Sequence, residues 1–229
     1  MVDFHTHILP GADHGSHSID ISLRQLALAK KHGVDKIIAT SHFYPHVHSV
    51  DEFISLRNTS YNNLKKKADA DSPQIKLGAE VLLCDGMEKL SGLELLCISG
   101  TNILLLELPF DGFEESYVST VKKIINKGIR VILAHADRYD ADSIERLVDV
   151  GAKIQLNASA FSCIFPKKHL TYWLKRGLVV ALGSDIHGAD SHAYIRFNRA
   201  IKRLGAYASY VSEQSNKIWD MATEYSTLG

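Results

Sequence analysis

Seven short apolar runs of this chain each carry, at or near the carboxyl end, a side chain able to bind a metal ion. This repetition constrains the fold more than any other feature of the sequence. The runs are Val2–Ile8, Lys36–His42, Ile75–Val81, Ile103–Leu108, Val131–Asp137, Ile154–Ser159 and Val179–Asp185. Helical spacing of apolar residues, ending at Gly33, Gly128 and Gly151, fills several of the intervals. Strands that alternate with helices predict a mainly parallel sheet with helices outside it.

The same pattern predicts where the ligands meet. The carboxyl ends of parallel strands in a barrel gather at one face, where loops build active sites. Seven strands with a ligand at each tip favour a closed or distorted barrel over an open doubly wound sheet, and no GxGxxG or GxxxxGK[ST] loop supports the open alternative. We therefore predict an α/β fold, a distorted seven-stranded TIM-like (β/α)7 barrel with a metal cluster at the carboxyl ends of its strands. With 229 residues and 45% hydrophobic content, we expect a single domain over residues 1–229.

Composition excludes several classes of partner. Lys and Arg (26) balance Asp and Glu (26), so the chain has no broad basic field for nucleic acid or an anionic membrane. No segment approaches the roughly 20 apolar residues that span a bilayer, and no export signal is evident at the start. Three widely spaced cysteines, Cys84, Cys97 and Cys163, suggest reduced thiols rather than a disulfide framework. We expect a cytoplasmic protein without membrane insertion.

Two sequence pairs have the spacing of strand-borne ligands. His5 and His7 are two residues apart, and residues i and i+2 of a strand face the same side, so both imidazoles can bind one ion. Asp185 and His187 repeat this spacing at the end of the last run. Chance is a reasonable alternative for one such pair, but a weaker one for two pairs at strand ends.

Two glutamates lie in otherwise apolar surroundings. Glu80 follows Leu77-Gly78-Ala79, and Glu107 follows three leucines. An ionised carboxylate is costly to bury without a partner. Metal ions are suitable partners, and a salt bridge to Arg or Lys is the structural alternative for each glutamate.

Taken together, these motifs resemble the polymerase and histidinol phosphatase (PHP) superfamily. The matching motifs are Asp3-x-His5-x-His7, Thr40-Ser41-His42, Gly78-Ala79-Glu80, Glu107 after an apolar run, His135-x-x-Arg138 and Ser184-Asp185-x-His187, in that order over nearly the whole chain. The segments 9–15, 40–45 and 106–110 look most like the bacterial protein-tyrosine phosphatases of capsular and exopolysaccharide gene clusters. Those enzymes remove phosphate from tyrosines of a partner kinase that controls polysaccharide chain export.

The resemblance implies three metal ions, with manganese expected and iron or zinc as alternatives that the mixed ligands also suit. The implied ligands are His5, His7, Glu80 and Asp185 for the first ion, Glu80, Glu107 and His135 for the second, and Asp13, His42 and His187 for the third. The implied reaction is attack of a metal-bound hydroxide on a phosphomonoester. Arg138 would bind the phosphate, with a surface ion pair to Asp137 or Asp140 as its alternative role, and His42 or Asp13 could assist the leaving group. The implied partner is a phosphotyrosine protein, the C-terminal tyrosine cluster of a polysaccharide-export tyrosine kinase.

The chain departs from the phosphatase pattern in two places. Those enzymes usually have two acidic residues in the early loop, whereas the second position here is His14, so either Asp13 or His14 binds the third metal. They also tend to have an arginine after the final motif, where this chain offers His192 or Arg196 as substitutes.

Two polar residues near the ligands are expected to support the site. We expect Asp3 to orient a ligand imidazole. Asn157 is expected to bond substrate, water or a neighbouring loop.

Rival functions can be weighed on the same residues. A cysteine-dependent tyrosine phosphatase needs an Arg six residues after its Cys, but Leu90, Ile103 and His169 occupy those positions. A histidinol-phosphate or other small-molecule phosphatase of the same superfamily is the nearest alternative enzyme. A metal-binding regulatory module that has lost turnover is the nonenzymatic alternative. Neutral charge disfavours an exonuclease.

Overall fold

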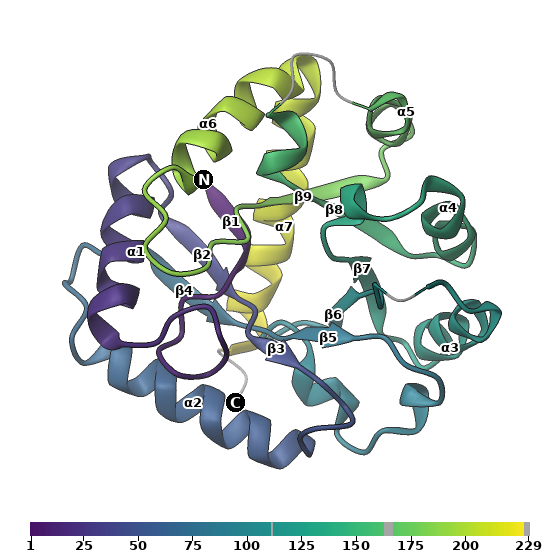
Figure 1. The fold of residues 1–229 in the computed structure, drawn as a ribbon, viewed down its shortest axis with the longest axis horizontal. Helices are drawn as coiled ribbons and strands as arrows, with labels where there is room; N and C mark the ends of the chain where they lie inside the picture. The colour runs from purple at the N-terminus through teal and green to yellow at the C-terminus, as the bar shows by residue number, and fades with distance from the viewer. Residues whose placement is uncertain (111, 163–166, 227–229) are drawn as a thin grey trace.

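The structure is a computed structural model that describes residues 1–110, 112–162 and 167–226, with the side chains of the last helix described as far as Met221 (Figure 1). The strands are β1 (Val2–Thr6), β2 (Lys36–Ala39), β3 (His42–Phe43), β4 (Gln74–Leu77), β5 (Glu80–Leu82), β6 (Ile103–Glu107), β7 (Arg130–Leu133), β8 (Lys153–Asn157) and β9 (Val179–Gly183). The α-helices are α1 (Ile19–Lys31), α2 (Val50–Lys65), α3 (Glu115–Asn126), α4 (Ala141–Asp149), α5 (Lys168–Lys175), α6 (Ala193–Leu204) and α7 (Ala208–Ser226). Short 3₁₀ helices are η1 (Met87–Lys89), η2 (Leu93–Leu96), η3 (Ala136–Arg138), η4 (Ala158–Phe161) and η5 (Gly205–Tyr207).

All strand pairings are parallel, and the strands form two sheets. One sheet has the order β1-β2-β4 and the other β3-β5-β6-β7-β8-β9. The sheets meet where β1 approaches the end of β9, with His7 N–H donating to Ile186 O at 3.2 Å and Asp185 N–H donating to His5 O at 2.9 Å. The prediction of a parallel α/β fold is therefore confirmed. A closed seven-stranded barrel is not confirmed, because within the described residues β1 and β9 form no strand ladder, and Thr6 makes only an isolated bridge with Ile186, after the end of β9.

Each of the seven apolar runs contains a strand, but two runs are broken into two strands. Run 36–42 contains β2 and β3, and run 75–81 contains β4 and β5. Hydrogen bonds from Gly78 N to Ala39 O (2.8 Å) and from Glu80 N to Ser41 O (3.0 Å) keep the two runs adjacent across the break. His42 and Glu80 therefore begin the second strand of their runs instead of ending a strand. The register pairs them directly.

The helices predicted from apolar spacing are confirmed in α1, α3 and α4. Capping explains where two helices begin: the Ser18 side chain accepts from Ile21 N before α1, and Ser49 and Glu52 form a capping box at α2. Figure 1 shows α1 and α2 on one side of the strands and α3, α4 and α5 on the other.

The C-terminal part of the chain packs against the strands. Helix α7 contacts β9 and β1, and Val211, Ile218 and Trp219 are buried there. The apolar face of this helix therefore packs on strands of both sheets of the same chain.

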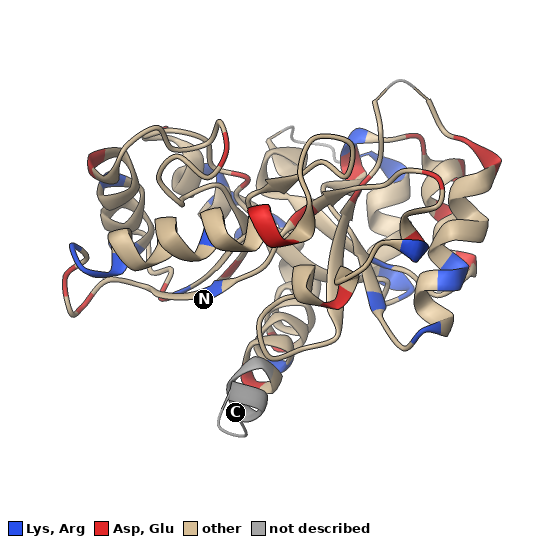
Figure 2. Ribbon diagram, turned by 90° about the horizontal axis from the view of Figure 1, so that it is seen from below, with Lys and Arg blue, Asp and Glu red and all other residues tan. Residues whose placement is uncertain are grey.

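The surface and the cysteines agree with the composition. Figure 2 shows acidic and basic residues intermixed over the helices. No helix within the described ranges is long and apolar enough to cross a membrane. Cys97 is buried and Cys84 half-buried, and both are free thiols, while Cys163 lies outside the described residues.

We expect Leu147→Ala in α4 to lower the free energy of unfolding by about 2–5 kcal/mol, because Leu147 is fully buried and truncation leaves a cavity. Leu56→Ala in α2 is the matched control, since Leu56 is 43% exposed and both positions are helical. Its effect should stay within about 0.5 kcal/mol. Urea unfolding measures both. Equal effects would show that α4 does not pack as described.

Candidate metal centre

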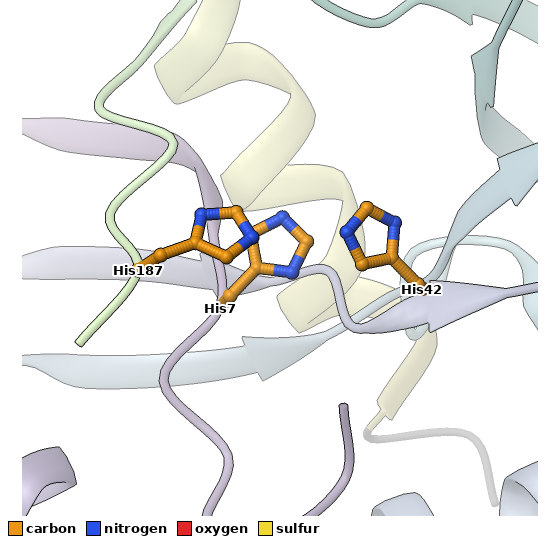
Figure 3. A group of neighbouring side chains, drawn as sticks. All are labelled: His7, His42 and His187. Atoms are coloured by element: carbon orange, nitrogen blue, oxygen red, sulfur yellow. The ribbon is translucent and has the colours of Figure 1, made fainter. Parts of the chain in front are cut away.

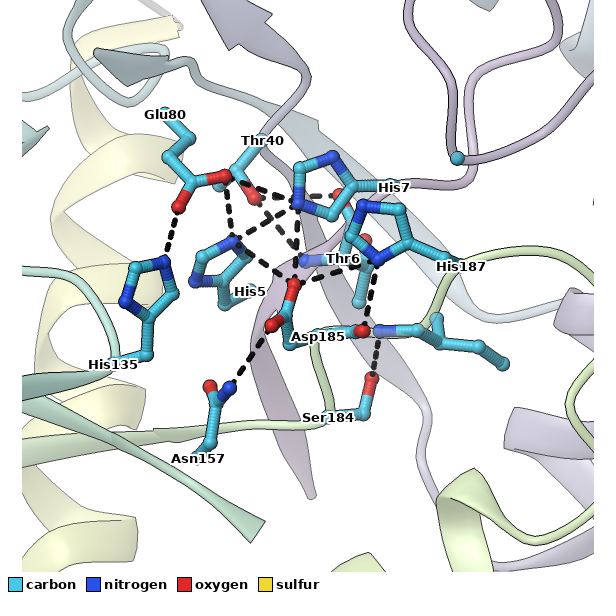
Figure 4. A network of polar contacts seen from close by, with 12 residues as sticks. His5, Thr6, His7, Thr40, Glu80, His135, Asn157, Ser184, Asp185 and His187 are labelled. Atoms are coloured by element: carbon cyan, nitrogen blue, oxygen red, sulfur yellow. Dashed lines mark hydrogen bonds and ion pairs between the residues drawn. The ribbon is translucent and has the colours of Figure 1, made fainter. Parts of the chain in front are cut away.

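Side chains from distant segments converge at one buried carboxylate, that of Glu80 (Figure 4). Its Oε2 atom lies 3.1 Å from His5 Nε2, 3.1 Å from His7 Nε2 and 3.0 Å from His42 Nδ1. Its Oε1 atom lies 2.6 Å from His135 Nε2. Four imidazoles from three segments thus surround one carboxylate.

The geometry around Glu80 fits a metal ion better than a set of hydrogen bonds. His5 Nε2 and His7 Nε2 face each other at 3.1 Å. Within the described part of the chain, neither Glu80 Oε2 nor His42 Nδ1 has a hydrogen-bond partner with good geometry. Buried polar atoms are nearly always satisfied, and converging lone pairs without aligned donors are an arrangement that a bound cation would satisfy. Imidazole nitrogens and carboxylate oxygens are suitable ligands for several divalent metals.

Two further groups of potential ligands adjoin this one. Glu107, at the end of β6, lies 3.4 Å from His135 Nε2 and 3.7 Å from His42 Nδ1 through its two oxygens. On the opposite side, His7, His42 and His187 offer ligand atoms within 4.8 Å of one another (Figure 3). Asp185 adjoins the first group, with Oδ1 at 3.6 Å from His5 Nε2 and 3.4 Å from His7 Nε2.

All nine residues predicted as metal ligands therefore lie in one contact network. The two-residue spacing works as expected for His5 and His7, which both reach Glu80. Asp13 joins differently from the rest: its Oδ2 accepts from His7 Nδ1 at 2.8 Å and from the backbone N–H of His42 at 3.1 Å.

Burial and mutual attraction shift the ionisation of these groups. Burial alone would raise the pKa of Glu80, but the charge of His5, the hydrogen bond with His135 and the close contact with His42 hold it well below its usual range. Burial alone would lower the pKa of His135, but Glu107 and Glu80 outweigh it and raise this pKa to about 9. For His187, burial and then the charge of His7 lower the pKa to about 4. In the absence of metal, protons on some imidazoles thus balance the carboxylates.

Gln155 is a supporting residue that the sequence analysis missed. It is fully buried in β8, and its Oε1 lies 3.2 Å from His5 Nδ1 and accepts from His135 N–H at 2.6 Å. One amide oxygen thus positions two predicted ligands. The available signal was a glutamine between Ile154 and Leu156 in an otherwise apolar strand.

Asn157 and Asp3 have structural roles in this arrangement. Asn157 Nδ2 donates to Asp185 Oδ2 at 2.9 Å, so it orients a predicted ligand. Asp3 Oδ1 accepts from Ser184 N–H at 2.8 Å and His5 N–H at 3.4 Å. Asp3 therefore holds the backbone at the end of β9 rather than an imidazole ring, contrary to the prediction.

Arg138 lies at the mouth of the cluster. Its side chain is 40% exposed and forms an ion pair with Asp185, not with Asp137 or Asp140. The two residues considered as a second phosphate clamp face elsewhere: Arg196 forms an ion pair with Asp190, and His192 Nδ1 lies 3.9 Å from the same carboxylate.

The backbone is strained at two predicted ligands. Among the described residues, His135 (φ 30°) and Asp185 (φ 53°) are the non-glycine residues with positive φ. Such conformations cost about 1–3 kcal/mol and cluster at functional sites. At Gly15, in contrast, the absence of a side chain is what matters. A Cβ there would lie 2.1 Å from His7 Cβ, so only glycine lets the early loop approach His7 this closely.

Comparison with known proteins identifies relatives of this chain. Residues 1–211 match the family model described as capsular polysaccharide synthesis, CpsB/CapC. The tyrosine-protein phosphatase CpsB of Streptococcus pneumoniae is 29% identical over 83% of this chain and 84% of its own length. The tyrosine-protein phosphatase YwqE of Bacillus subtilis is 26% identical over 85% of this chain and 80% of its own length.

A solved structure shares the fold. It comes from a study of YwqE from Bacillus subtilis and CpsB from Streptococcus pneumoniae, described as unique metal-dependent tyrosine phosphatases. It superposes with a TM-score of 0.75 and 22% identity, covering 94% of this chain and 93% of the other. At this identity the likeness shows the fold alone.

We expect Gly183→Ala to lower the free energy of unfolding by about 1–3 kcal/mol, because the new Cβ would lie 2.5 Å from His5 Cβ and 2.7 Å from Gln155 Nε2. Gly78→Ala is the control, since its Cβ would meet side-chain carbons at 3.5–3.6 Å, an ordinary contact distance. Urea unfolding of both variants measures the difference. If Gly183→Ala were as stable as Gly78→Ala, the close approach of β9 to His5 would be wrong.

Proposed function

This chain belongs to the CpsB/CapC family of capsular polysaccharide synthesis, and from that membership we propose that it is a metal-dependent protein-tyrosine phosphatase. The observation that carries the proposal is the buried carboxylate of Glu80 among four imidazoles. Curated relatives that align over most of this chain are tyrosine-protein phosphatases, which supports the same activity here.

The proposed cluster holds three ions, with manganese expected. His5, His7, Glu80 and Asp185 would bind the first ion, and Glu80, Glu107 and His135 the second. His42 and His187 would bind the third, together with Asp13 or His14 of the early loop. The close contacts of Glu80 with both groups support its role as a bridge between the first two sites.

An aromatic cavity beside the cluster supports an aryl phosphate as substrate. The cavity has a volume of about 250 Å³, and its lining includes Phe110, Phe113, Tyr139 and Arg138. Phe110 is 72% exposed, and its ring stacks on Tyr139 at 5.6 Å and on His135 at 6.5 Å. Stacked aromatic walls next to a predicted metal ligand suit a phenol ring whose phosphate points at the cluster.

The protein side chains would bind and orient the phosphate ester. Arg138 would donate its planar fork to phosphate oxygens, while Asn157 holds Asp185 in place when Arg138 turns to the substrate. Bound metal ions would supply a water of lowered pKa and neutralise charge that grows on the phosphate. Phenol has a pKa of about 10, so its oxide is a tolerable leaving group. His42 or Asp13, which are joined by a hydrogen bond from the His42 backbone N–H to Asp13 Oδ2 at 3.1 Å, would assist proton transfer to it.

The proposed partner is a phosphotyrosine protein, namely the C-terminal tyrosine cluster of a polysaccharide-export tyrosine kinase in the cytoplasm. Family membership in capsular polysaccharide synthesis supports this pathway. We further propose that the two sheets act together as one distorted (β/α)7 barrel and one domain. The meeting of β1 and β9 beside His5 supports that arrangement.

We expect metal-reconstituted protein to release phosphate from a phosphotyrosine peptide, and His5→Ala/His7→Ala to lower this rate by at least about 100-fold. Both imidazoles contact Glu80, so their loss should empty the first site. Released phosphate and metal content are measured on the same samples.

His46→Ala/His48→Ala is the control for that double variant, because these two histidines are also two residues apart but are not among the imidazoles that contact Glu80 in the described chain. It should keep its bound metal. Preference for histidinol phosphate over the peptide would identify a small-molecule phosphatase instead. Metal binding without release from either substrate would favour a regulatory module.

We expect Arg138→Ala to lower kcat/KM for the peptide by about 10–100-fold without loss of metal, because hydrogen bonds to a charged group contribute about 1.5–3 kcal/mol. Arg130→Ala is the control: Arg130 begins β7, at the opposite end of the strand that precedes Arg138, and donates to Asn102 at 3.1 Å. Steady-state kinetics should show an unchanged kcat/KM for the Arg130→Ala variant. Equal kinetics for the two variants would remove Arg138 from substrate binding.

A further inference from the structure

The early loop between β1 and α1 contains two candidate ligands for the third metal, Asp13 and His14, and their surroundings differ. Asp13 already has three N–H or imidazole partners. Its Oδ2 accepts from His7 Nδ1 at 2.8 Å and from His42 N–H at 3.1 Å, and its Oδ1 accepts from Gly15 N–H at 2.8 Å. Its side chain is only 4% exposed. A carboxylate that holds the far nitrogen of a ligand imidazole is the usual supporting arrangement around metals.

His7 cannot complete the third site, although it lies close to His42 and His187. Its Nδ1 is engaged by Asp13, and its Nε2 lies 3.1 Å from Glu80 in the first group. Both ring nitrogens of His7 therefore already have partners, Asp13 and Glu80. A third ligand must come from another residue.

His14 lies beside both His42 and His187. Its ring is 4.8 Å from the ring of His42 with an interplanar angle of 12°, and 4.8 Å from the ring of His187 with an angle of 29°. It lies on the exposed side of the loop, so its side chain can turn without leaving a packed position. Three imidazoles from three separate segments thus adjoin one another at the open side of the cluster.

We propose that His14, His42 and His187 form an all-imidazole third metal site, and that Asp13 is a positioning residue for His7. This inference rests on the proposed metal cluster and specifies its third site. Because imidazole suits zinc, iron and nickel, whereas carboxylates suit manganese and magnesium, the third site prefers zinc over manganese. The first two sites retain carboxylates. Three histidines with an open position form a known type of catalytic zinc site.

The test uses the full chain reconstituted with zinc, with manganese, or with equal amounts of both, then freed of loose metal and analysed by mass spectrometry. His14→Ala should bind one ion fewer per chain, with affinity for that ion reduced by more than about 100-fold. Asp13→Asn should keep the number of bound ions. His14→Asp should keep the third ion but shift the zinc-to-manganese ratio at that site toward manganese by at least about tenfold.

His17→Ala is the matched control, as an exposed histidine of the same loop, and should behave as the unaltered chain. Thermal unfolding confirms that each variant is folded. Loss of an ion in Asp13→Asn but not in His14→Ala would overturn the inference and make Asp13 the ligand. Unchanged metal content in both variants would also overturn it. Because these readouts need no turnover, a chain that binds three ions but releases no phosphate would contradict only the proposed function.

Discussion

The buried carboxylate of Glu80 is the constraint on which the rest of the site depends. A carboxylate without solvent must be compensated, and here the compensating groups are His5, His7, His42 and His135, from β1, the residue after β1, β3 and the loop after β7. Apart from His5 and His7, which lie on one segment, these residues are far apart in the chain. The parallel topology serves chiefly to bring them to one point, and the break that starts β5 at Glu80 puts this carboxylate beside His42. Fold and site are therefore linked through a single electrostatic requirement.

The strained backbone at His135 and Asp185 is a second consequence of gathering side chains around Glu80. Glycine would adopt the backbone conformations at His135 and Asp185 without cost, but glycine has no side chain to offer the cluster. The strained segments are instead held by hydrogen bonds: His135 N–H donates to Gln155 Oε1, and Asp185 N–H donates to His5 O. Gln155 thus links His5, a predicted ligand of the first ion, to His135, a predicted ligand of the second. The rigidity needed to keep several lone pairs converging comes from these neighbours as much as from the ligands.

Much of this site could be predicted because its signals are local. The two-residue spacing of His5 and His7 follows from the strand period, and Glu80 and Glu107 stand out against apolar neighbours. What could not be predicted depends on partners distant in sequence. The break between β2 and β3 arises where pairing passes from one sheet to the other. Arg138 pairs with Asp185 rather than with nearby Asp137, because the Asp137 carboxylate accepts from Asn157 N–H at 2.8 Å. Gln155 was missed because its role lies in contacts with His5 and His135, which sequence spacing does not reveal.

The charge balance of the cluster also bears on how metals enter it. Histidine binds a metal through a neutral nitrogen, so a proton on a ligand imidazole must leave when an ion arrives. With its pKa raised to about 9, His135 carries such a proton at neutral pH, and the proton partly compensates Glu80 and Glu107 until an ion replaces it. The pKa of His187 is instead lowered to about 4, so this imidazole is neutral and ready to bind. In the proposed cluster, an ion that binds beside Glu80 would replace the proton of His135, whereas His187 would have no such proton to release. The proposed sites beside Glu80 and beside His187 would therefore differ in the protons that metal binding releases.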